Sequence, residues 1–440
     1  MECPARPSSQ TRSPGRHLYA APAVWAPTTE TYWSTPSAST RTSWRSWRTP
    51  VSWPDTPTGP LDGVRVLEMA GQGPVPFAGM VLADMGADVL RLERSTGRTV
   101  KLVPPRFDVV GRGRRSVAID MKAPGAADLV LDLARTADVF LEGFRPGVCE
   151  RLGVGPDACL TANPSLVYTR ITGWGQDGPR AQLGGHDINY VAVTGALNAI
   201  GERSGPPVPP LNLVGDFGGG GMSALIGVLA ALQAVARGGP GQVVDVSMAE
   251  GVATLLATTY GYHSAGALSD ERESNFVDGG SPHYRTYRCA DGGYVAVGAV
   301  EPVFFKRLVE TLDVDVDPAL QHDRAAWPRI RRCLEASFAT RTRDEWAEIF
   351  SRVDACVSPV LDLGEAHNDA QLDARGALLE VDDVRQPAPS PRFSRTPTTA
   401  GHPPRPPGTD TRSALAAWGV AGAAVRALLD AGVVSEPNLG

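Results

Sequence analysis

The stretch VRVLEMAGQGPVPFAGMVLADMGADVLRLER, residues 64–94, decides the fold. Residues 64–70 are an apolar run rich in β-forming types, and residues 71–76 have the glycine and proline content of a turn. The apolar residues at positions 77, 80, 81 and 85 then have helical spacing, and residues 87–94 have the pattern of a second buried strand. Strand, turn, helix and strand predict a βαβ unit, whose right-handed crossover makes the two strands parallel.

The same alternation of strand and helix patterns continues along the chain. Further strands are predicted at residues 116–121, 138–143, 166–174 and 243–248, and helices at residues 126–136, 218–236 and 249–262. A hairpin that turns at Asp291-Gly292 is predicted at residues 286–300, followed by helices at residues 302–312, 327–338 and 343–353. The proline-rich residues 386–407 predict an extended connector before a last helix at residues 413–429. The alternation favours the α/β class with a doubly wound sheet.

Residues 1–58 differ in composition from everything that follows. They are dominated by Ser, Thr, Pro, Arg and Trp and show neither helical nor strand periodicity. Such a segment buries too little apolar surface to offset the entropy lost on ordering. We therefore expect it to lie outside the fold, and we hypothesise that it is upstream sequence translated from an over-extended start.

Charge and cysteine content exclude several classes of protein. The net charge of -6 argues against a nucleic-acid partner. The six cysteines include no CxxC pair, so neither a metal site nor a disulfide framework is predicted, and a cytoplasmic chain is expected. Residues 218–236 are uncharged and about as long as a short membrane span, but their Gly and Ala content favours a buried core helix over a membrane segment.

The turn at residues 71–76 is a weak match to a dinucleotide-binding fingerprint. Gly71 and Gly73 fit G-x-G-x-x-G, but Pro76 occupies the place of the third glycine. Glu93 stands where a ribose-binding acid would be expected. A structural turn is the better interpretation, and NAD binding is disfavoured.

Two segments place ionisable residues among small and apolar ones. They are GGHDINY, residues 184–190, with His186, and NLVGDFGGGGM, residues 212–222, with Asp216. The second segment leads into the long apolar helix, so Asp216 is predicted at a helix entry, followed by four glycines. Glycines let a ligand approach the backbone, and a helix N-terminus stabilises an anionic intermediate such as an enolate. Taken singly, Asp216 could equally be a helix N-cap, and His186 a core histidine.

Together these segments resemble the α-methylacyl-CoA racemases of the family III CoA-transferase superfamily. The resemblance covers about residues 60–400, with its motifs in the same order. Beside GHDINY and LVGDFGGG, these are PLDGVRVLEMAG, GADVLRLER, EGFRPGVCERLGVGP, TGWGQDGP, VDGGSPHYRTYRCADGGYVAVGAVEPVFF and PRFSRTP.

The resemblance implies a role for each motif residue. His186 and Asp216 would be acid and base on opposite faces of the α-carbon of an acyl-CoA, and Glu301 would orient His186. The other residues that the resemblance assigns to CoA or substrate binding are Arg94, Ile119, Asp120, Met121, Lys122, Gly143, Phe144, Arg145, Arg151, Gly185, Asp187 and Tyr190. The arginines suit this role because the guanidinium fork matches phosphate oxygens.

The resemblance also implies an architecture and a set of partners. We expect an interlocked homodimer, in which a large Rossmann-like domain (residues 59–248 with 380–440) is joined by a linker (249–284) to a smaller α+β domain (285–379). Glu301 would then meet His186 across subunits. The substrate would be an acyl-CoA of lipid or fatty-acid metabolism, with no cofactor beyond CoA itself.

Two other functions stay open at this point. In a family III CoA-transferase, an aspartate at the position of Asp216 attacks the thioester as a nucleophile and forms a mixed anhydride. Such an enzyme needs no base about thirty residues before the aspartate, so His186 favours the racemase. A catalytically silent CoA-binding protein is a third reading, which the presence of all three candidate catalytic residues disfavours.

Overall fold

The centre of the computed structural model is a seven-stranded sheet in the order β12-β3-β2-β1-β4-β5-β6. The structure describes residues 59–94 and 103–437, so the hypothesis about residues 1–58 lies outside the described residues. The strands are β1 (Arg65–Met69), β2 (Asp88–Arg94), β3 (Arg114–Ile119), β4 (Val139–Glu142), β5 (Val167–Thr172), β6 (Gln242–Ser247) and β12 (Val434–Ser435). All are parallel except β12, which pairs antiparallel with β3. The predicted α/β class is confirmed, and the order 3-2-1-4-5-6 is that of doubly wound dinucleotide-binding folds.

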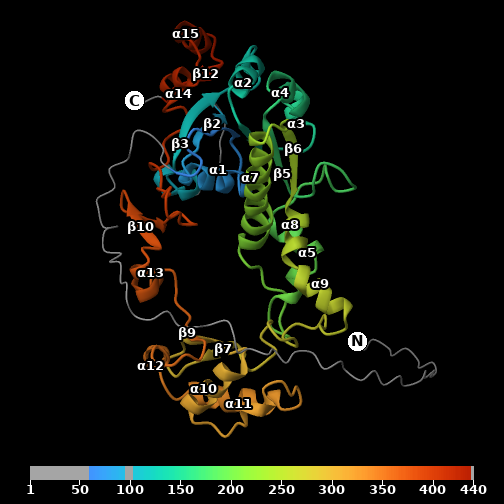
Figure 1. Cartoon of the computed structure of the whole chain (residues 1–440), viewed down its shortest axis with the longest axis vertical. Helices are drawn as coiled ribbons and strands as arrows, with labels where there is room; N and C mark the ends of the chain where they lie inside the picture. The colour runs from blue at the N-terminus through green and yellow to red at the C-terminus, as the bar shows by residue number, and fades with distance from the viewer. Residues whose placement is uncertain (1–58, 95–102, 438–440) are drawn as a thin grey trace, which may run out of the picture. The chain divides into compact units, whose positions relative to one another are not determined.

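Helices bury both faces of this sheet (Figure 1). On one face α1 (Pro74–Asp84) and α7 (Ser223–Ala236) pack against alternate strand residues such as Val66 and Val139. On the other face Leu67 and Phe140 belong to a core that includes residues of α2 (Ala126–Ala134), α4 (Pro156–Ala162), α14 (Thr411–Ala417) and α15 (Gly422–Asp430). Burial on both faces explains the largely apolar sequence of the central strands β1 and β4.

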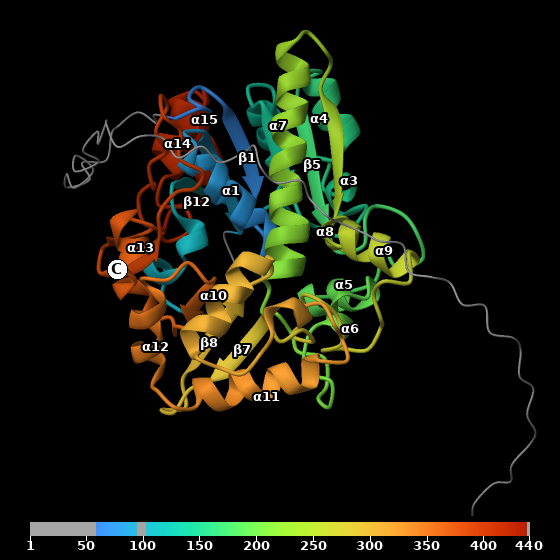
Figure 2. The same cartoon turned by 60° about the horizontal axis from the view of Figure 1, so that its bottom comes forward.

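A second group of elements has a core of its own (Figure 2). The antiparallel strands β7 (Tyr284–Arg288), β8 (Tyr294–Gly298) and β9 (Val357–Pro359) pack with α10 (Pro302–Leu312), α11 (Trp327–Phe338) and α12 (Arg343–Phe350). The predicted hairpin is confirmed, and Gly292 at its turn has the positive φ of 87° that glycine accepts without strain. Both α10 and α11 have the predicted bounds, whereas the domain boundaries stay a prediction.

Several predicted elements differ from the structure: the helix expected at residues 218–236 is α-helical only from Ser223, the strand expected at 116–121 is Arg114–Ile119, and the helix expected at 343–353 ends at Phe350. The helix expected at residues 249–262 is two helices, α8 (Met248–Leu255) and α9 (Ala257–Ser264). The last helix is interrupted at Gly419, whose φ of 90° ends α14 before α15 begins. The first residues of the predicted connector belong to a hairpin of β10 (Leu378–Val381) and β11 (Val384–Pro387). Its turn is made by Asp382 and Asp383, which both adopt positive φ. That turn lacks the glycine by which such hairpins are recognised in a sequence.

The remaining described elements are short. They are the helices α3 (Val148–Arg151), α5 (Asp187–Val193), α6 (Ala196–Ala199) and α13 (Ala370–Ala374), the π-helix η4 (Leu213–Met222), and 3₁₀ turns at Pro105–Phe107, Val109–Gly111, Pro318–Leu320 and Ala366–Asn368.

The continuous segment Leu213–Ala236, formed by η4 and α7, is long and apolar enough to cross a membrane by length and composition. Leu225 and Val228 are buried against the sheet, but the side chain of Ile226 is 67% exposed. The expectation of a buried core helix is therefore met on one face only.

Candidate active site

Several candidate site residues lie at the carboxyl edge of the parallel sheet. Arg94 ends β2 and is the register partner of Ile119, which ends β3, and residues 143–145 directly follow β4. The chain runs outward from β1 through β2 to β3 and then returns to β4 on the other side of β1. Ligands of doubly wound folds bind outside the carboxyl ends of the strands at this switch point. The fold thus brings segments far apart in sequence to one edge.

His186 and Asp216 lie within electrostatic reach of each other. His186 is the N-cap residue of α5, with an exposed side chain, and its backbone N–H donates to Asn189 Oδ1 at 3.0 Å. Asp216 is half-buried in the first turn of η4. The charge of His186 acts on the Asp216 carboxyl and lowers its pKa. The two residues that the sequence singled out are therefore neighbours in the fold.

The Asp216 carboxyl has a pKa above its ordinary value. Burial is the largest cause; the hydrogen bond from Asn212 Nδ2, at 3.2 Å, opposes the rise, and the negative charge of Asp187 adds to it. Gly73 lies directly against this carboxyl, since a Cβ there would be 2.8 Å from Asp216 Oδ2. A raised pKa favours the protonated form of the carboxyl, the form that acts as a general acid.

Asp216 is not the N-cap of its helix, because η4 begins at Leu213 and Asn212 holds the N-cap position. The backbone N–H of Asp216 donates to Asp187 Oδ2 at 2.7 Å. Asp187 was expected to contact substrate, but its side chain is only 7% exposed. Its second oxygen, Oδ1, has no hydrogen-bond partner among the described residues.

The glycines after Asp216 make room for neighbouring helices and not for a ligand. A Cβ on Gly219 would lie 2.7 Å from Met248 O, one on Gly220 2.9 Å from Pro74 Cβ, and one on Gly221 2.5 Å from the Phe77 ring. All three glycines are buried. The expectation that this run admits a ligand is wrong for these positions, and close packing of η4 on α1 and α8 explains them. π-Helical turns of this kind are rare in proteins, and those that occur are often found at functional sites.

Tyr190 and Gly185 pack on each other. The Tyr190 ring is buried, and a Cβ on Gly185 would lie 2.7 Å from it, while one on Gly173 would lie 2.1 Å away. The ring of Trp174 meets Tyr190 edge-on at 4.8 Å between centroids. Burial is the main cause that raises the pKa of Tyr190, and the charge of Asp216 adds to it. Tyr190 is thus held by packing on Gly185, Gly173 and Trp174, within electrostatic reach of Asp216.

A buried ion network holds the turn that follows β4. Glu142 Oε2 accepts the N–H of Phe144 at 2.7 Å, and Oε1 accepts from Arg170 Nε at 2.8 Å. Arg170 also donates to both carboxylate oxygens of Glu150 in α3. The turn carries Arg145, whose guanidinium reaches the loop before His186: a Cβ on Gly184 would lie 3.0 Å from Arg145 Nη2.

The other candidate phosphate contacts differ in accessibility. Arg94, Lys122 and Arg151 are exposed near the carboxyl edge, whereas the Ile119 side chain is buried in the core. Asp120 accepts the backbone N–H of Lys122 and so shapes the turn after β3. Met121 is partly buried and packs against the same core.

Glu301 stands at the start of α10, in the N-cap position, and is exposed. In the described part of the chain no hydrogen bond or ion pair joins it to His186 or Asp216. Its orienting role stays a prediction.

The residue expected to bind a dinucleotide ribose, Glu93, is not available for that role. Glu93 is buried and accepts a hydrogen bond from the Ser116 hydroxyl, so its carboxylate is engaged inside the protein. Within residues 59–94 and 103–437, no group of three or more His, Cys, Asp and Glu side chains is placed to hold a metal ion.

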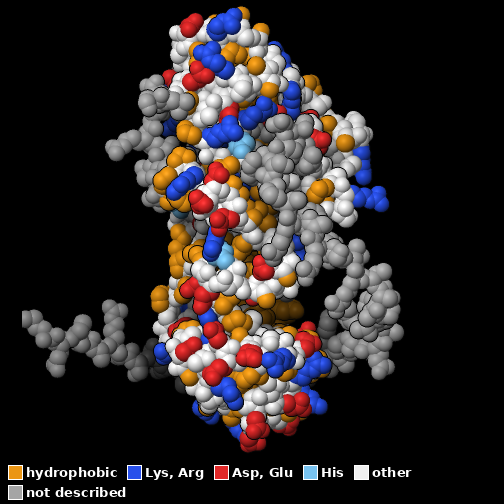
Figure 3. Space-filling model, turned by 90° about the vertical axis from the view of Figure 1, so that its left-hand side faces the viewer, with side chains coloured by type: hydrophobic (Ala, Val, Ile, Leu, Met, Phe, Trp, Pro, Cys, Tyr) orange, Lys and Arg blue, Asp and Glu red, His pale blue; other side chains and the backbone are white. Residues whose placement is uncertain are grey.

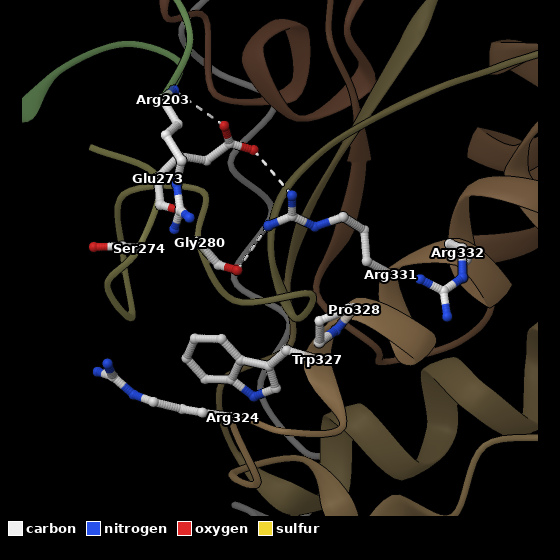
Figure 4. Close-up of a pocket in the computed structure, with 9 residues that line it drawn as sticks. All are labelled: Arg203, Glu273, Ser274, Gly280, Arg324, Trp327, Pro328, Arg331 and Arg332. Carbon is white, nitrogen blue, oxygen red and sulfur yellow. Dashed lines mark hydrogen bonds and ion pairs between the residues drawn. The ribbon is translucent and has the colours of Figure 1, made fainter. Parts of the chain in front are cut away.

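A cavity of about 520 Å³ lies elsewhere, between α11 and the loop around Glu273 (Figure 4). Four arginines line it, and two of them bind the loop: Arg331 donates to Glu273 Oε1 at 3.2 Å and to Gly280 O at 2.9 Å, and Arg203 donates to Glu273 through its backbone and guanidinium. None of the candidate catalytic residues lines it. The cavity is therefore separate from the candidate catalytic residues.

Known proteins share much of this sequence and of this fold. The chain is 42% identical over 341 residues to the α-methylacyl-CoA racemase of Mus musculus, covering 77% of this chain and 87% of the mouse protein. It is 30% identical to the acetyl-CoA:oxalate CoA-transferase of Acetobacter aceti, covering 76% of this chain and 89% of that protein. The crystal structure of a CaiB/BaiF family protein from Brucella suis superposes with a TM-score of 0.71 at 25% identity, covering 82% of this chain and 100% of the other. The family model described as CoA-transferase family III matches residues 61–411, and the chain belongs to that family.

Proposed function

We propose that this protein is a racemase that inverts the α-carbon of 2-methylacyl-CoA thioesters. The observation that carries the proposal is a half-buried Asp216 of raised pKa within electrostatic reach of His186, on a segment that Asp187, the residue after His186, binds by a hydrogen bond. The similarity to the mouse racemase supports the same conclusion.

The two side chains divide one proton exchange between them. For one enantiomer of the substrate, the Asp216 carboxylate takes the α-proton, and the electron pair of the broken C–H bond moves into the thioester carbonyl to form an enolate. Protonated His186 then delivers a proton to the opposite face of the same carbon, which restores the carbonyl and inverts the centre. For the other enantiomer the roles reverse. Catalysis of this kind works best when both groups exchange protons near the working pH, and burial moves Asp216 in that direction.

The CoA moiety would lie along the carboxyl edge. Arg94, Arg145 and Arg151 present guanidinium groups that suit the phosphates, and Lys122 adds a further cation. The acyl chain needs apolar surface beside the reacting carbon. The stacked rings of Phe77 and Phe217, 4.8 Å apart and adjacent to Asp216, supply it.

The second candidate function is CoA transfer, because the relatives of this chain include CoA-transferases. Asp216 would then form a mixed anhydride with the acyl group. His186 has no task in that reaction, and this favours racemisation.

The proposal includes a homodimer. On η4 and α7 the side chains of Met222 and Ile226 are 48% and 67% exposed, and Leu255 on the neighbouring α8 is 60% exposed. Contiguous apolar surface of this kind marks a protein interface, and a second copy would cover it. Glu301 of that copy would then orient His186. Sedimentation velocity should give about twice the mass of the chain; a monomer at micromolar concentration would contradict the proposal.

Neither nucleic acid nor membrane is proposed as a partner. On the face shown in Figure 3, basic and acidic side chains are interspersed and do not form a field of one sign. The proposed setting is cytoplasmic lipid or fatty-acid metabolism, with no cofactor beyond the CoA of the substrate.

Deuterium exchange tests the proposal directly. A single enantiomer of a 2-methylacyl-CoA, incubated with the protein in deuterium oxide, should gain deuterium at C2 and lose optical purity. Transfer of CoA to a free acid without exchange at C2 would establish the second candidate instead.

Two single variants separate the roles of the two bases. His186→Ala and Asp216→Ala should each slow inversion by about 10²–10⁴-fold. Each should still exchange the α-proton of the one enantiomer that faces the remaining base. Asp138→Asn is a matched control, because this carboxylate accepts a backbone N–H at 2.8 Å just before β4, at the opposite edge of the sheet. Full inversion by His186→Ala would remove the histidine from the mechanism.

A further inference from the structure

We propose that Asp187 is a positioning residue that holds Asp216 in place relative to His186; this inference rests on the proposed function. Asp187 follows His186 in the chain and is the first residue of α5. Its Oδ2 accepts the backbone N–H of Asp216 at 2.7 Å. One side chain therefore links the segments that carry both bases.

The packing around this hydrogen bond leaves it little freedom. Asp187 is 7% exposed, and a Cβ on Gly215 would lie 2.5 Å from Asp187 Oδ2. Glycine at position 215 is thus required for the carboxylate to reach the backbone of the next residue. Hydrogen bonds to an ionised acceptor are shorter and stronger than neutral ones, so this contact resists displacement of the first turn of η4.

The charge of Asp187 acts on Asp216 as well. Since Oδ1 has no hydrogen-bond partner among the described residues, this buried charge is only partly compensated. The groups facing the Asp216 carboxyl are Asp187 and His186, the amide of Asn212, and Tyr190 from α5. Asp187 raises the pKa of Asp216, and His186 and Asn212 lower it.

Buried and already bonded to the backbone, Asp187 works through Asp216 and not by touching CoA. The resemblance to known racemases had grouped Asp187 with the ligand contacts. A CoA contact would appear in KM, whereas a positioning residue appears in kcat and in the pH dependence of the reaction.

Two substitutions separate position from charge. Asp187→Asn keeps an oxygen that accepts the Asp216 N–H but removes the charge. Asp187→Ala removes both, and a displacement of about 1 Å at a reacting group can cost about a hundredfold in rate. We expect Asp187→Ala to lose about a hundredfold in kcat with KM for the acyl-CoA little changed, and Asp187→Asn to lose far less. Asp138→Asn, which also alters a carboxylate bound to a backbone N–H, should behave as the unaltered protein.

The decisive readout is the pKa of the Asp216 carboxyl, followed by ¹³C NMR in the full-length protein and in Asp187→Asn. Removing a negative neighbour should lower this pKa, and the acid limb of kcat/KM should move to lower pH for the enantiomer deprotonated by Asp216. An unchanged kcat in Asp187→Ala, or a loss confined to KM, would overturn the inference, and an unchanged titration in Asp187→Asn would overturn the effect of the Asp187 charge. Absence of deuterium exchange in the unaltered protein would instead overturn the proposed function, while the NMR titration would still report on Asp187.

Discussion

Replacing His283 with phenylalanine should make the protein more resistant to acid. The His283 side chain is fully buried, and neither ring nitrogen has a hydrogen-bond partner among the described residues. Its ring is surrounded by those of Phe276, Phe305 and Trp327, with centroids 4.9, 5.9 and 6.0 Å away. Burial, with a smaller contribution from the charge of His322, lowers the pKa of His283 to about 4.

The free energy of unfolding depends on pH because the pKa of His283 differs between the folded and the unfolded chain. The folded protein keeps His283 neutral, whereas the unfolded chain binds a proton at the ordinary imidazole pKa, so stability is complete above that pKa and is lost as pH falls toward 4. Lowering the His283 pKa from its ordinary value to about 4 corresponds to about 3 kcal/mol of unfolding free energy in total. About 2 kcal/mol of this is lost between pH 7 and pH 5. Phenylalanine carries no titrating group and fills a similar space. The variant should therefore not lose this part of its unfolding free energy as the pH falls.

Urea unfolding at pH 7 and pH 5 measures the difference. Trp327 and Trp346 belong to the same core as the His283 neighbour Phe305, so tryptophan fluorescence reports on the relevant region. Between the two pH values the unaltered protein should lose about 2 kcal/mol more unfolding free energy than His283→Phe. His263→Gln, which alters an exposed imidazole on α9, should follow the unaltered protein. Equal losses in the unaltered protein and His283→Phe would refute the reasoning.

Two further substitutions probe the site. Gly73→Ala should lower kcat by about a hundredfold, because its Cβ would press on Asp216. Gly63→Ala, which has a similar positive φ and nothing within 4 Å of its Cβ, should be active. Comparable activity of the two variants would contradict the packing argument. Glu142→Gln should raise KM for acyl-CoA by about tenfold with kcat nearly unchanged, because weakening the charge-assisted bonds to Arg170 and to the turn 143–145 loosens the proposed phosphate contact. Steady-state kinetics on the purified variants checks both, and an unchanged KM in Glu142→Gln would separate this network from CoA binding.

Local patterns were sufficient for much of the fold. The βαβ start, the hairpin at Asp291-Gly292 and the bounds of α10 and α11 follow from hydrophobic periodicity and turn residues, which act over a few positions. The hairpin around Asp382 and Asp383 was missed because its turn residues give no glycine signal. The interruption between α8 and α9 was missed because the apolar pattern runs through it.

The sequence by itself determined the α/β class and the choice of His186 and Asp216, because periodicity and ordered motifs are properties of neighbouring residues. Only the tertiary structure decided what surrounds Asp216. Gly73 and Asp187 reach it from segments far away in the chain, and the glycine run after it serves helix packing. Burial and hydrogen bonding at a carboxyl depend on which distant segments the sheet brings to its carboxyl edge, and that is settled when the whole chain packs.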